Sequence, residues 1–141
     1  MRYRFSDLTL SSDEPLPELT PATDGDAEVQ IDWLSTGPPE QGAVFQTWMT
    51  PSDTEWLTFA DADNGLLLTF VPHSQFWVSC DGRSVRVYDT PDTPVETTRH
   101  LLLNQVLPLV LSRRGRVVLH ASAISWNGQV SAFIEIGRAH V

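Results

Sequence analysis

The side chains of this sequence that could take part in chemistry are few and scattered. His73, His100, His120 and Cys80 lack the spacing of metal ligands, and Cys80 has no histidine near it in sequence, which predicts an inert thiol. Ser122 lacks the flanking glycines of a hydrolase nucleophile. His120 follows a short apolar segment. The residues alone allow two roles for it, a core histidine bonded to the backbone or a site residue.

Two further patterns resemble binding sites. Residues 61–65, Asp-Ala-Asp-Asn-Gly, hint at a calcium loop, but a third ligand before the glycine and a later glutamate are missing at the required spacing. A polar turn between two strands is predicted there instead. The tryptophans could form a platform for stacking sugars, yet they lie in separate apolar segments. Core packing is therefore predicted for Trp33, Trp48, Trp56, Trp77 and Trp126.

The composition limits the classes of function. The chain has 141 residues, a formal net charge of −9 and 41% apolar residues, which is typical of a folded protein. Its negative charge disfavours nucleic acids and anionic membrane surfaces as partners. No segment approaches the ~20 apolar residues of a membrane span. A single cysteine and a start without a signal peptide predict a cytoplasmic protein.

The first two thirds of the chain read as short strands separated by turns. We expect residues 2–10 to form one strand, followed by a proline-rich surface loop. Six further segments alternate or are apolar between turn residues, which predicts an antiparallel meander or a small sandwich. These segments are 27–33, 43–49, 55–60, 65–71, 74–80 and 84–90.

A helix is expected to follow. Residues 93–96, Thr-Pro-Val-Glu, have the pattern of a capping box, with Thr93 as the N-cap. Gly115 is placed to end the helix, and Pro108 should kink or interrupt it near Asn104. The apolar face of this long helix is predicted to consist of Leu102, Leu103, Val106, Leu107, Val110 and Leu111.

Three strands are predicted after the helix. Residues 117–119 form the first, and residues 122–126 and 129–134 flank Asn127-Gly128, a strong signal for a two-residue hairpin turn. The last segment, QVSAFI, is almost wholly apolar. We therefore expect it to be a strand covered on both faces.

The seven residues at 135–141, EIGRAHV, do not fit this pattern. They match a translation of a common sequencing adapter, GAG ATC GGA AGA GCA CAC GTC, in all seven positions. We interpret them as a non-native tail, so Arg138 and His140 receive no functional role.

Two parts of the chain resemble the HPr kinase-like serine kinases, which are P-loop proteins. One is LLLNQVLPLVLSRRGRVVLHASAISWNGQVSAFI at 101–134, and the other is YRFSDLTLSSDEPLPELTPA at 3–22. The resemblance implies a full-length protein that uses ATP and Mg²⁺ to phosphorylate a serine of a protein or peptide. Relatives of this family share their core with phosphoenolpyruvate carboxykinase, so a small-molecule acceptor stays open.

The resemblance also gives His120 a role. It implies that a histidine here approaches the phosphate site, where it would position the acceptor hydroxyl or contact a phosphate. HPr kinases proper have His-Gly where this chain has His120-Ala121, which leaves HPr itself in doubt as the substrate. The glycine-rich loop G-x-x-x-x-G-K-[ST], expected directly after residue 134, is missing.

These observations predict an α+β fold. Residues 1–92 would form an antiparallel β-rich module, and residues 93–134 would open a truncated P-loop kinase domain with one long helix and its first strands. Residues 135–141 would be foreign. We expect this fragment to be inactive and to bind no cofactor, because no loop cradles the phosphates. The alternative function is a non-catalytic β-sandwich binding module that ends near residue 141.

Overall fold

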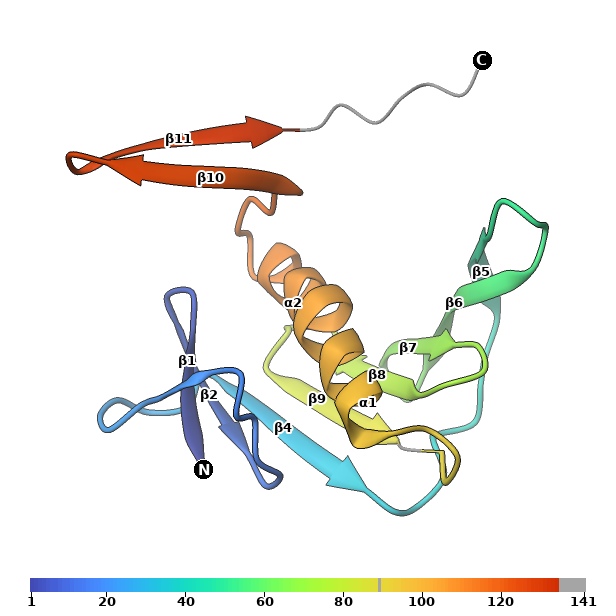
Figure 1. Ribbon diagram of the computed structural model, residues 1–141. Helices are drawn as coiled ribbons and strands as arrows, with labels where there is room; N and C mark the ends of the chain where they lie inside the picture. The colour runs from blue at the N-terminus through green and yellow to red at the C-terminus, as the bar shows by residue number, and fades with distance from the viewer. Residues whose placement is uncertain (89, 135–141) are drawn as a thin grey trace.

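The protein is mainly a β structure (Figure 1). The computed structural model describes residues 1–88 and 90–134, of which 44% lie in strands and 14% in helices. The predicted α+β fold with a long helix is therefore wrong. Strands dominate because nearly every apolar segment before residue 89 joins one sheet.

Nine strands make up this sheet, and two more form a separate hairpin after the helical segment. The sheet strands are β1 Arg2–Phe5, β2 Leu8–Ser12, β3 Thr20–Pro21, β4 Val29–Leu34, β5 Val44–Met49, β6 Glu55–Ala62, β7 Gly65–Phe70, β8 Gln75–Ser79 and β9 Ser84–Tyr88. The helical segment consists of α1 Val95–Leu101, a π-helical turn η1 Leu102–Val106 and α2 Leu107–Arg113, and the hairpin strands are β10 Ala121–Trp126 and β11 Gln129–Ile134.

The sheet is mixed rather than antiparallel, which corrects the prediction for residues 1–92. Its strand order is β3-β1-β2-β4-β9-β8-β7-β6-β5, and β4 runs parallel to both of its neighbours, β2 and β9. Val29 and Ile31 of β4 are fully buried, as the alternation of this segment predicts. Sequence alternation identifies the strand but carries no information about the direction of its neighbours.

The predicted meander is confirmed for β5 to β9, which pair in sequence order and antiparallel. The turn between β6 and β7 is formed by Asp63 and Asn64, both with positive φ, so the acidic run is a hairpin turn as expected. Residues 2–10 differ from the prediction. They form the two paired strands β1 and β2, because the chain reverses at Ser6, whose φ is 56°.

The helical segment runs without a gap from Val95 to Arg113, but a π-helical turn separates its two α-helical parts. Pro108 lacks the N–H that would bond to the carbonyl of Asn104, and the π-helical turn η1 lies around that position. The predicted interruption is thus confirmed, whereas the expectation of one long helix is wrong, since α1 and α2 each have 7 residues. Among the described residues, no helix has the length and apolar character needed to cross a bilayer.

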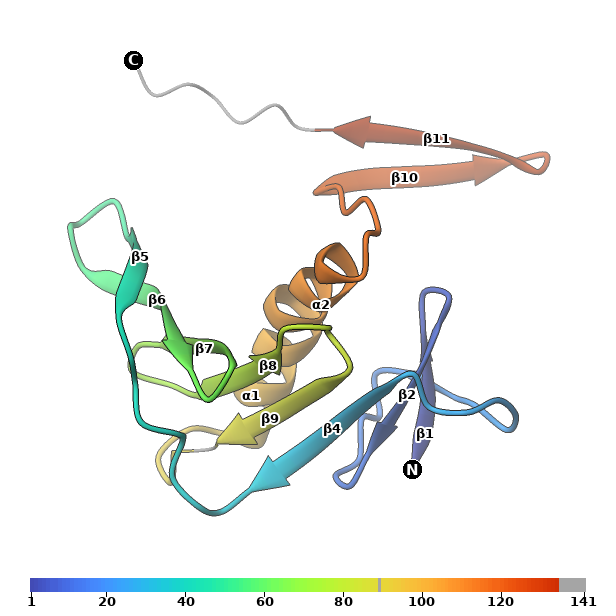
Figure 2. The ribbon, with the colours of Figure 1, turned by 180° about the vertical axis from the view of Figure 1, so that it is seen from behind.

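The helical segment packs on one face of the sheet and buries the main core. Seen from behind, the strands β8 and β9 lie in front of it, and the strand pairs β1–β2 and β5–β6 lie to either side in both views (Figures 1 and 2). Four helical residues are buried in the same cluster as residues of the sheet: Leu102, Val106, Leu107 and Val110. Residues on both sides of position 92 thus share a core, and the boundary predicted there stays a prediction.

The start of the helix does not use the predicted capping box. The N-cap is Pro94, and no side chain caps the first turn. Instead, the Thr93 hydroxyl contacts the Thr90 hydroxyl and donates to the carbonyl of His73. The helix is tied to the sheet one turn later, where the buried hydroxyls of Thr98 and Ser74 lie 2.7 Å apart. A tertiary contact therefore replaces the local cap.

An ion pair also joins this helix to the N-terminal third of the chain. The Arg99 guanidinium donates to the Glu18 carboxylate over 2.8 Å, and the Arg99 side chain is only 15% exposed. This hydrogen bond lowers the pKa of Glu18 below 4.5. Such a carboxyl stabilises the folded protein at pH values above the pKa that it has in the unfolded chain. This stabilisation is lost as the pH falls through the lower pKa that it has in the folded protein.

We predict that Glu18→Gln will make the free energy of unfolding fall less steeply as the pH is lowered into the acid range. The wild-type protein should lose stability faster than the variant as pH falls below about 4.5, because only the wild type must protonate Glu18 on losing the pair. Urea unfolding midpoints measured between about pH 3 and pH 7 would check this. The control is Glu40→Gln, since Glu40 belongs to no ion pair in residues 1–88 and 90–134. Parallel pH curves for Glu18→Gln and wild type would contradict the prediction.

Candidate functional site

The candidate site lies where the helical segment ends and the chain continues to His120. The helix stops in a Schellman motif, in which the Arg116 N–H bonds to the carbonyl of Leu111 and the Gly115 N–H bonds to that of Ser112. Gly115 has φ 76°, which confirms its predicted role as the residue that ends the helix. This motif sets the direction in which the chain leaves the core.

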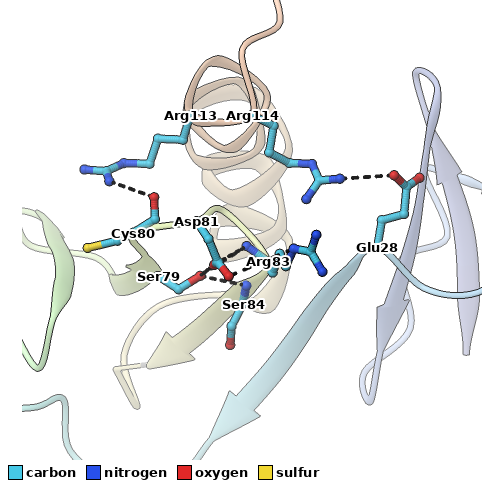
Figure 3. Close-up of polar contacts among 8 residues, drawn as sticks. All are labelled: Glu28, Ser79, Cys80, Asp81, Arg83, Ser84, Arg113 and Arg114. Carbon is cyan, nitrogen blue, oxygen red and sulfur yellow. Dashed lines mark hydrogen bonds and ion pairs between the residues drawn. The ribbon is translucent and has the colours of Figure 1, made fainter.

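Two arginines hold this helix end against the sheet (Figure 3). Arg114 donates to the Glu28 carboxylate over 3.0 Å, and its side chain is only 17% exposed. Arg113 reaches in the other direction, to the carbonyl of Cys80 at 3.4 Å. The arginine cluster is thus a structural anchor between the helix, the β8–β9 turn and the start of β4. Cys80 is exposed, and its thiol lies 2.9 Å from the carbonyl of Asn64.

The β8–β9 turn under this helix end is held by its own side chains (Figure 3). The Ser79 hydroxyl donates to the Asp81 carboxylate over 2.7 Å and accepts the backbone N–H of Ser84. The hydrogen bond from Ser79, supported by the N–H of Arg83, lowers the pKa of Asp81. Gly82 has φ 65°, and a Cβ there would lie 3.1 Å from Cγ of Arg114 and 3.3 Å from the carbonyl of Val110. A side chain at this position would require the helix end to shift by a few tenths of an ångström and would be strained by the positive φ, which favours glycine.

His120 lies outside the core. Residues 117–119, predicted to be a strand, have no regular structure, so that prediction is wrong. His120 follows directly and is exposed, one residue before β10. It makes no hydrogen bond to any other described residue. A core histidine bonded to the backbone is thus not what the structure contains, and the role at a phosphate site stays a prediction.

The hairpin of β10 and β11 confirms the turn at Asn127-Gly128, where both residues have positive φ. The prediction that the segment QVSAFI is covered on both faces is wrong, because all twelve residues of the two strands are exposed. The hairpin lies beyond the C-terminal end of α2 in both views (Figures 1 and 2). Nothing in the described chain packs on it.

Both faces of this hairpin have large apolar side chains and no charged ones. Cross-strand pairing places Trp126, Ile124 and Phe133 on one face with Ser122, Ser131 and Gln129. The opposite face has Val130 and Ile134 with four small residues, Ala121, Ala123, Ser125 and Ala132. Residues 117–134 contain no Asp, Glu, Lys or Arg. A hairpin of this composition is typical of a sheet covered on both sides.

The remaining sequence candidates are not brought together. Within the described residues, no group of His, Cys, Asp or Glu could hold a metal ion. The prediction of core packing holds for Trp77, which is 6% exposed, but is wrong for Trp48 and Trp126, which are 42% and 78% exposed. The position of a glycine-rich phosphate loop falls on residues 135–141, outside the described residues.

The sequence predictions missed an aromatic groove beside the helical segment. It is lined by Trp48, Phe59 and Phe70 of the sheet and by Gln105 and Leu109 of the helix. The only signal in the sequence was the density of aromatic residues between 45 and 59. The spacing of residues along the sequence could not show that the helical segment lies beside these aromatic residues.

No family model, curated protein or solved structure matches this chain. The resemblance to HPr kinase-like serine kinases therefore stays a prediction based on residues 3–22 and 101–134.

Gly82→Ala should destabilise the protein by about 1–3 kcal/mol, because alanine disfavours positive φ and its Cβ would press on the helix end. Urea denaturation would measure this. The control is Gly37→Ala, where an added Cβ meets nothing within 4 Å. Equal effects of the two substitutions would contradict the close approach between the turn and the helix.

Replacing Val130 and Phe133 by lysine should reduce self-association without lowering the stability of the sheet. The two side chains are 69% and 60% exposed on opposite faces of the hairpin, so lysine removes apolar surface from both. Light scattering and urea unfolding would measure the two effects. Gln129→Lys adds charge without removing apolar surface and serves as the control. If the double variant lowered the stability of the sheet, the conclusion that the hairpin does not pack on the sheet would be contradicted.

Proposed function

We propose that the chain is the N-terminal part of an ATP-dependent, HPr kinase-like serine kinase, inactive by itself, whose helical segment and sheet form a scaffold for the first strands of the catalytic domain. The full-length protein would transfer a phosphoryl group from ATP, with Mg²⁺, to a serine of a protein or peptide. Its single cysteine favours a reducing compartment such as the cytoplasm. The resemblance at 3–22 and 101–134 supplies the family.

The observation that carries the proposal is the uncharged hairpin with two apolar faces. A two-stranded hairpin is marginally stable in water, and a large exposed apolar surface marks a contact that is made elsewhere. In a P-loop protein the strand that leads into the phosphate loop is buried in a sheet with helices on both sides. The composition of β11 suits that position. Its end at Ile134 is where the loop is expected.

The residues of this chain do not fit ATP. The sequence contains no lysine, and residues 135–141 do not match G-x-x-x-x-G-K-[ST], the pattern of a loop whose backbone N–H groups bind phosphates. A phosphate loop needs both to neutralise the charge that develops during transfer. We therefore assign no catalytic step to the chain alone.

His120 is the residue of this chain that the proposal places near the reacting groups. It lies directly before β10, which pairs with β11, so it shares an end of the hairpin with Ile134. A histidine there could position the acceptor hydroxyl or contact a phosphate. Its exposure in this chain leaves it accessible to such a partner.

A non-catalytic β-sandwich binding module is the competing function. It requires a second sheet packed face to face on the first. The hairpin strands are exposed on every residue, and the helical segment occupies one face of the large sheet. These observations give the sandwich less support than the kinase.

The proposal predicts that this chain binds no ATP at millimolar concentration in calorimetry. The uninterrupted gene should encode G-x-x-x-x-G-K-[ST] directly after Ile134, and the protein extended through that domain should bind ATP and phosphorylate serine. In the extended protein, His120→Ala should lower kcat by about 10²-fold or more, and His100→Ala, on the helix, should not.

Three results would refute the assignment. They are clear ATP binding by the present chain, a gene that terminates directly after Val141, and an extended protein that binds ATP but has no kinase activity.

A further inference from the structure

The chain contains two Asn-Gly dipeptides, and both lie where one antiparallel strand turns into the next. They are Asn64-Gly65, between β6 and β7, and Asn127-Gly128, between β10 and β11. This dipeptide is chemically labile, because glycine has no side chain to shield its backbone nitrogen from the amide carbon of the preceding asparagine. The sequence makes the two dipeptides equivalent, so any difference in their reactivity has to come from the fold.

Gly65 is fixed within the large sheet. It pairs with Ala62 of β6 across the turn and with Ser79 of β8 on its other side. A Cβ at Gly65 would lie 2.5 Å from the ring of Trp77, so this ring lies directly against the glycine. Rotation of the main chain is needed to bring the Gly65 nitrogen against the side chain of Asn64. The strands paired on both sides of Gly65 oppose this rotation.

Gly128 lies in a more open turn. Trp126 pairs with Gln129, so Asn127 and Gly128 are themselves the two turn residues, both with positive φ. No backbone carbonyl among the described residues accepts a hydrogen bond from the Gly128 N–H, and a Cβ at Gly128 would meet nothing within 4 Å. Rotation at this turn disturbs only a two-stranded ladder of exposed residues. An isolated ladder of this kind opens easily in water.

We propose that Asn127 is a site of spontaneous deamidation and that the sheet protects Asn64 from the same reaction. The Gly128 backbone nitrogen gives up its proton and attacks the side-chain amide carbon of Asn127. A carbon–nitrogen bond forms, and the amide nitrogen leaves as ammonia. Water then opens the resulting cyclic imide at either carbonyl, which gives aspartate or isoaspartate. Each modified chain consumes one water and releases one ammonia, and nothing is oxidised or reduced.

The reaction changes the hairpin in two ways. Both products place a carboxylate in residues 117–134, which contain no Asp, Glu, Lys or Arg before modification. In isoaspartate the main chain also gains one carbon, because it continues through the former side chain. A two-residue turn has a narrowly defined geometry, so the extra carbon disturbs the pairing of Trp126 with Gln129. This inference goes beyond the proposed kinase function and does not depend on it.

The test follows the three asparagines of the full chain during incubation in mildly alkaline buffer. The chain contains no lysine, so trypsin cleaves it only after arginine and places Asn64, Asn104 and Asn127 on the separate peptides 5–83, 100–113 and 117–138. Mass spectrometry of each peptide measures the conversion of amide to carboxylate. We expect Asn127 to react at least about tenfold faster than Asn64, because opening the hairpin costs less free energy than opening the sheet.

Unfolding in urea separates the effect of the fold from that of the sequence. Without the sheet, Asn64 should react about tenfold faster or more and reach a rate similar to that of Asn127, whose own rate should change little. Asn127→Gln is the matched variant, because its longer side chain would have to close a larger ring. It should abolish the conversion in peptide 117–138 and leave the slow rate of Asn64 unchanged.

A second variant, Gly128→Ala, tests the attacking nitrogen. Alanine shields this nitrogen and also disfavours the positive φ of the turn, so the hairpin opens more often while the chemical step becomes slower. We expect at least about a tenfold slower conversion of Asn127 in this variant. An unchanged or faster conversion would overturn the proposed attack. Equal rates at Asn64 and Asn127 in the folded chain would overturn the proposal, as would equal acceleration of both on unfolding.

Discussion

The packing of the helical segment on the sheet is the interaction on which the rest of this structure depends. Leu102, Val106, Leu107 and Val110 are each 1% exposed or less, and burial of one such side chain contributes about 1.5–3 kcal/mol. This contact covers the middle of the sheet and fixes the direction of the helix. The helix direction in turn sets where the chain leaves the core, and hence where His120 and the hairpin lie. The aromatic groove also follows from it, because Gln105 and Leu109 of the helix form one of its walls.

The polar contacts at the two ends of this helix refine its position. Thr98 and Ser74 share a buried hydrogen bond near the start, and Arg114 pairs with Glu28 near the end. Hydrogen bonds of this kind contribute about 1 kcal/mol each, less than the apolar contact between them. Their main effect is to fix the position of the helix along the sheet. A helix shifted by one residue would leave the hydroxyls of Thr98 and Ser74 unpaired.

Much of the local structure was predictable, because it depends on short-range chemistry. Alternation of apolar residues located β4 to β9, and Asn127-Gly128 located the last hairpin. The missing N–H of Pro108 explained the interrupted helix. Strand order was not predictable, since the parallel pairing of β4 with β9 joins residues 54 positions apart, Gln30 and Ser84. The capping box at Thr93 failed because the Thr93 hydroxyl found a tertiary partner, His73, that the local sequence does not contain.

The placement of β4 has a consequence for the order in which the chain can fold during synthesis. Residues 29–34 leave the ribosome early, but one of their two neighbours, β9, ends only at residue 88. At about 5–20 residues per second, β4 waits on the order of 3–10 s with that edge unpaired. The first three strands cannot join the meander before then. The strand β4, next to the central strand β9, is therefore made early and among the last to be paired on both edges.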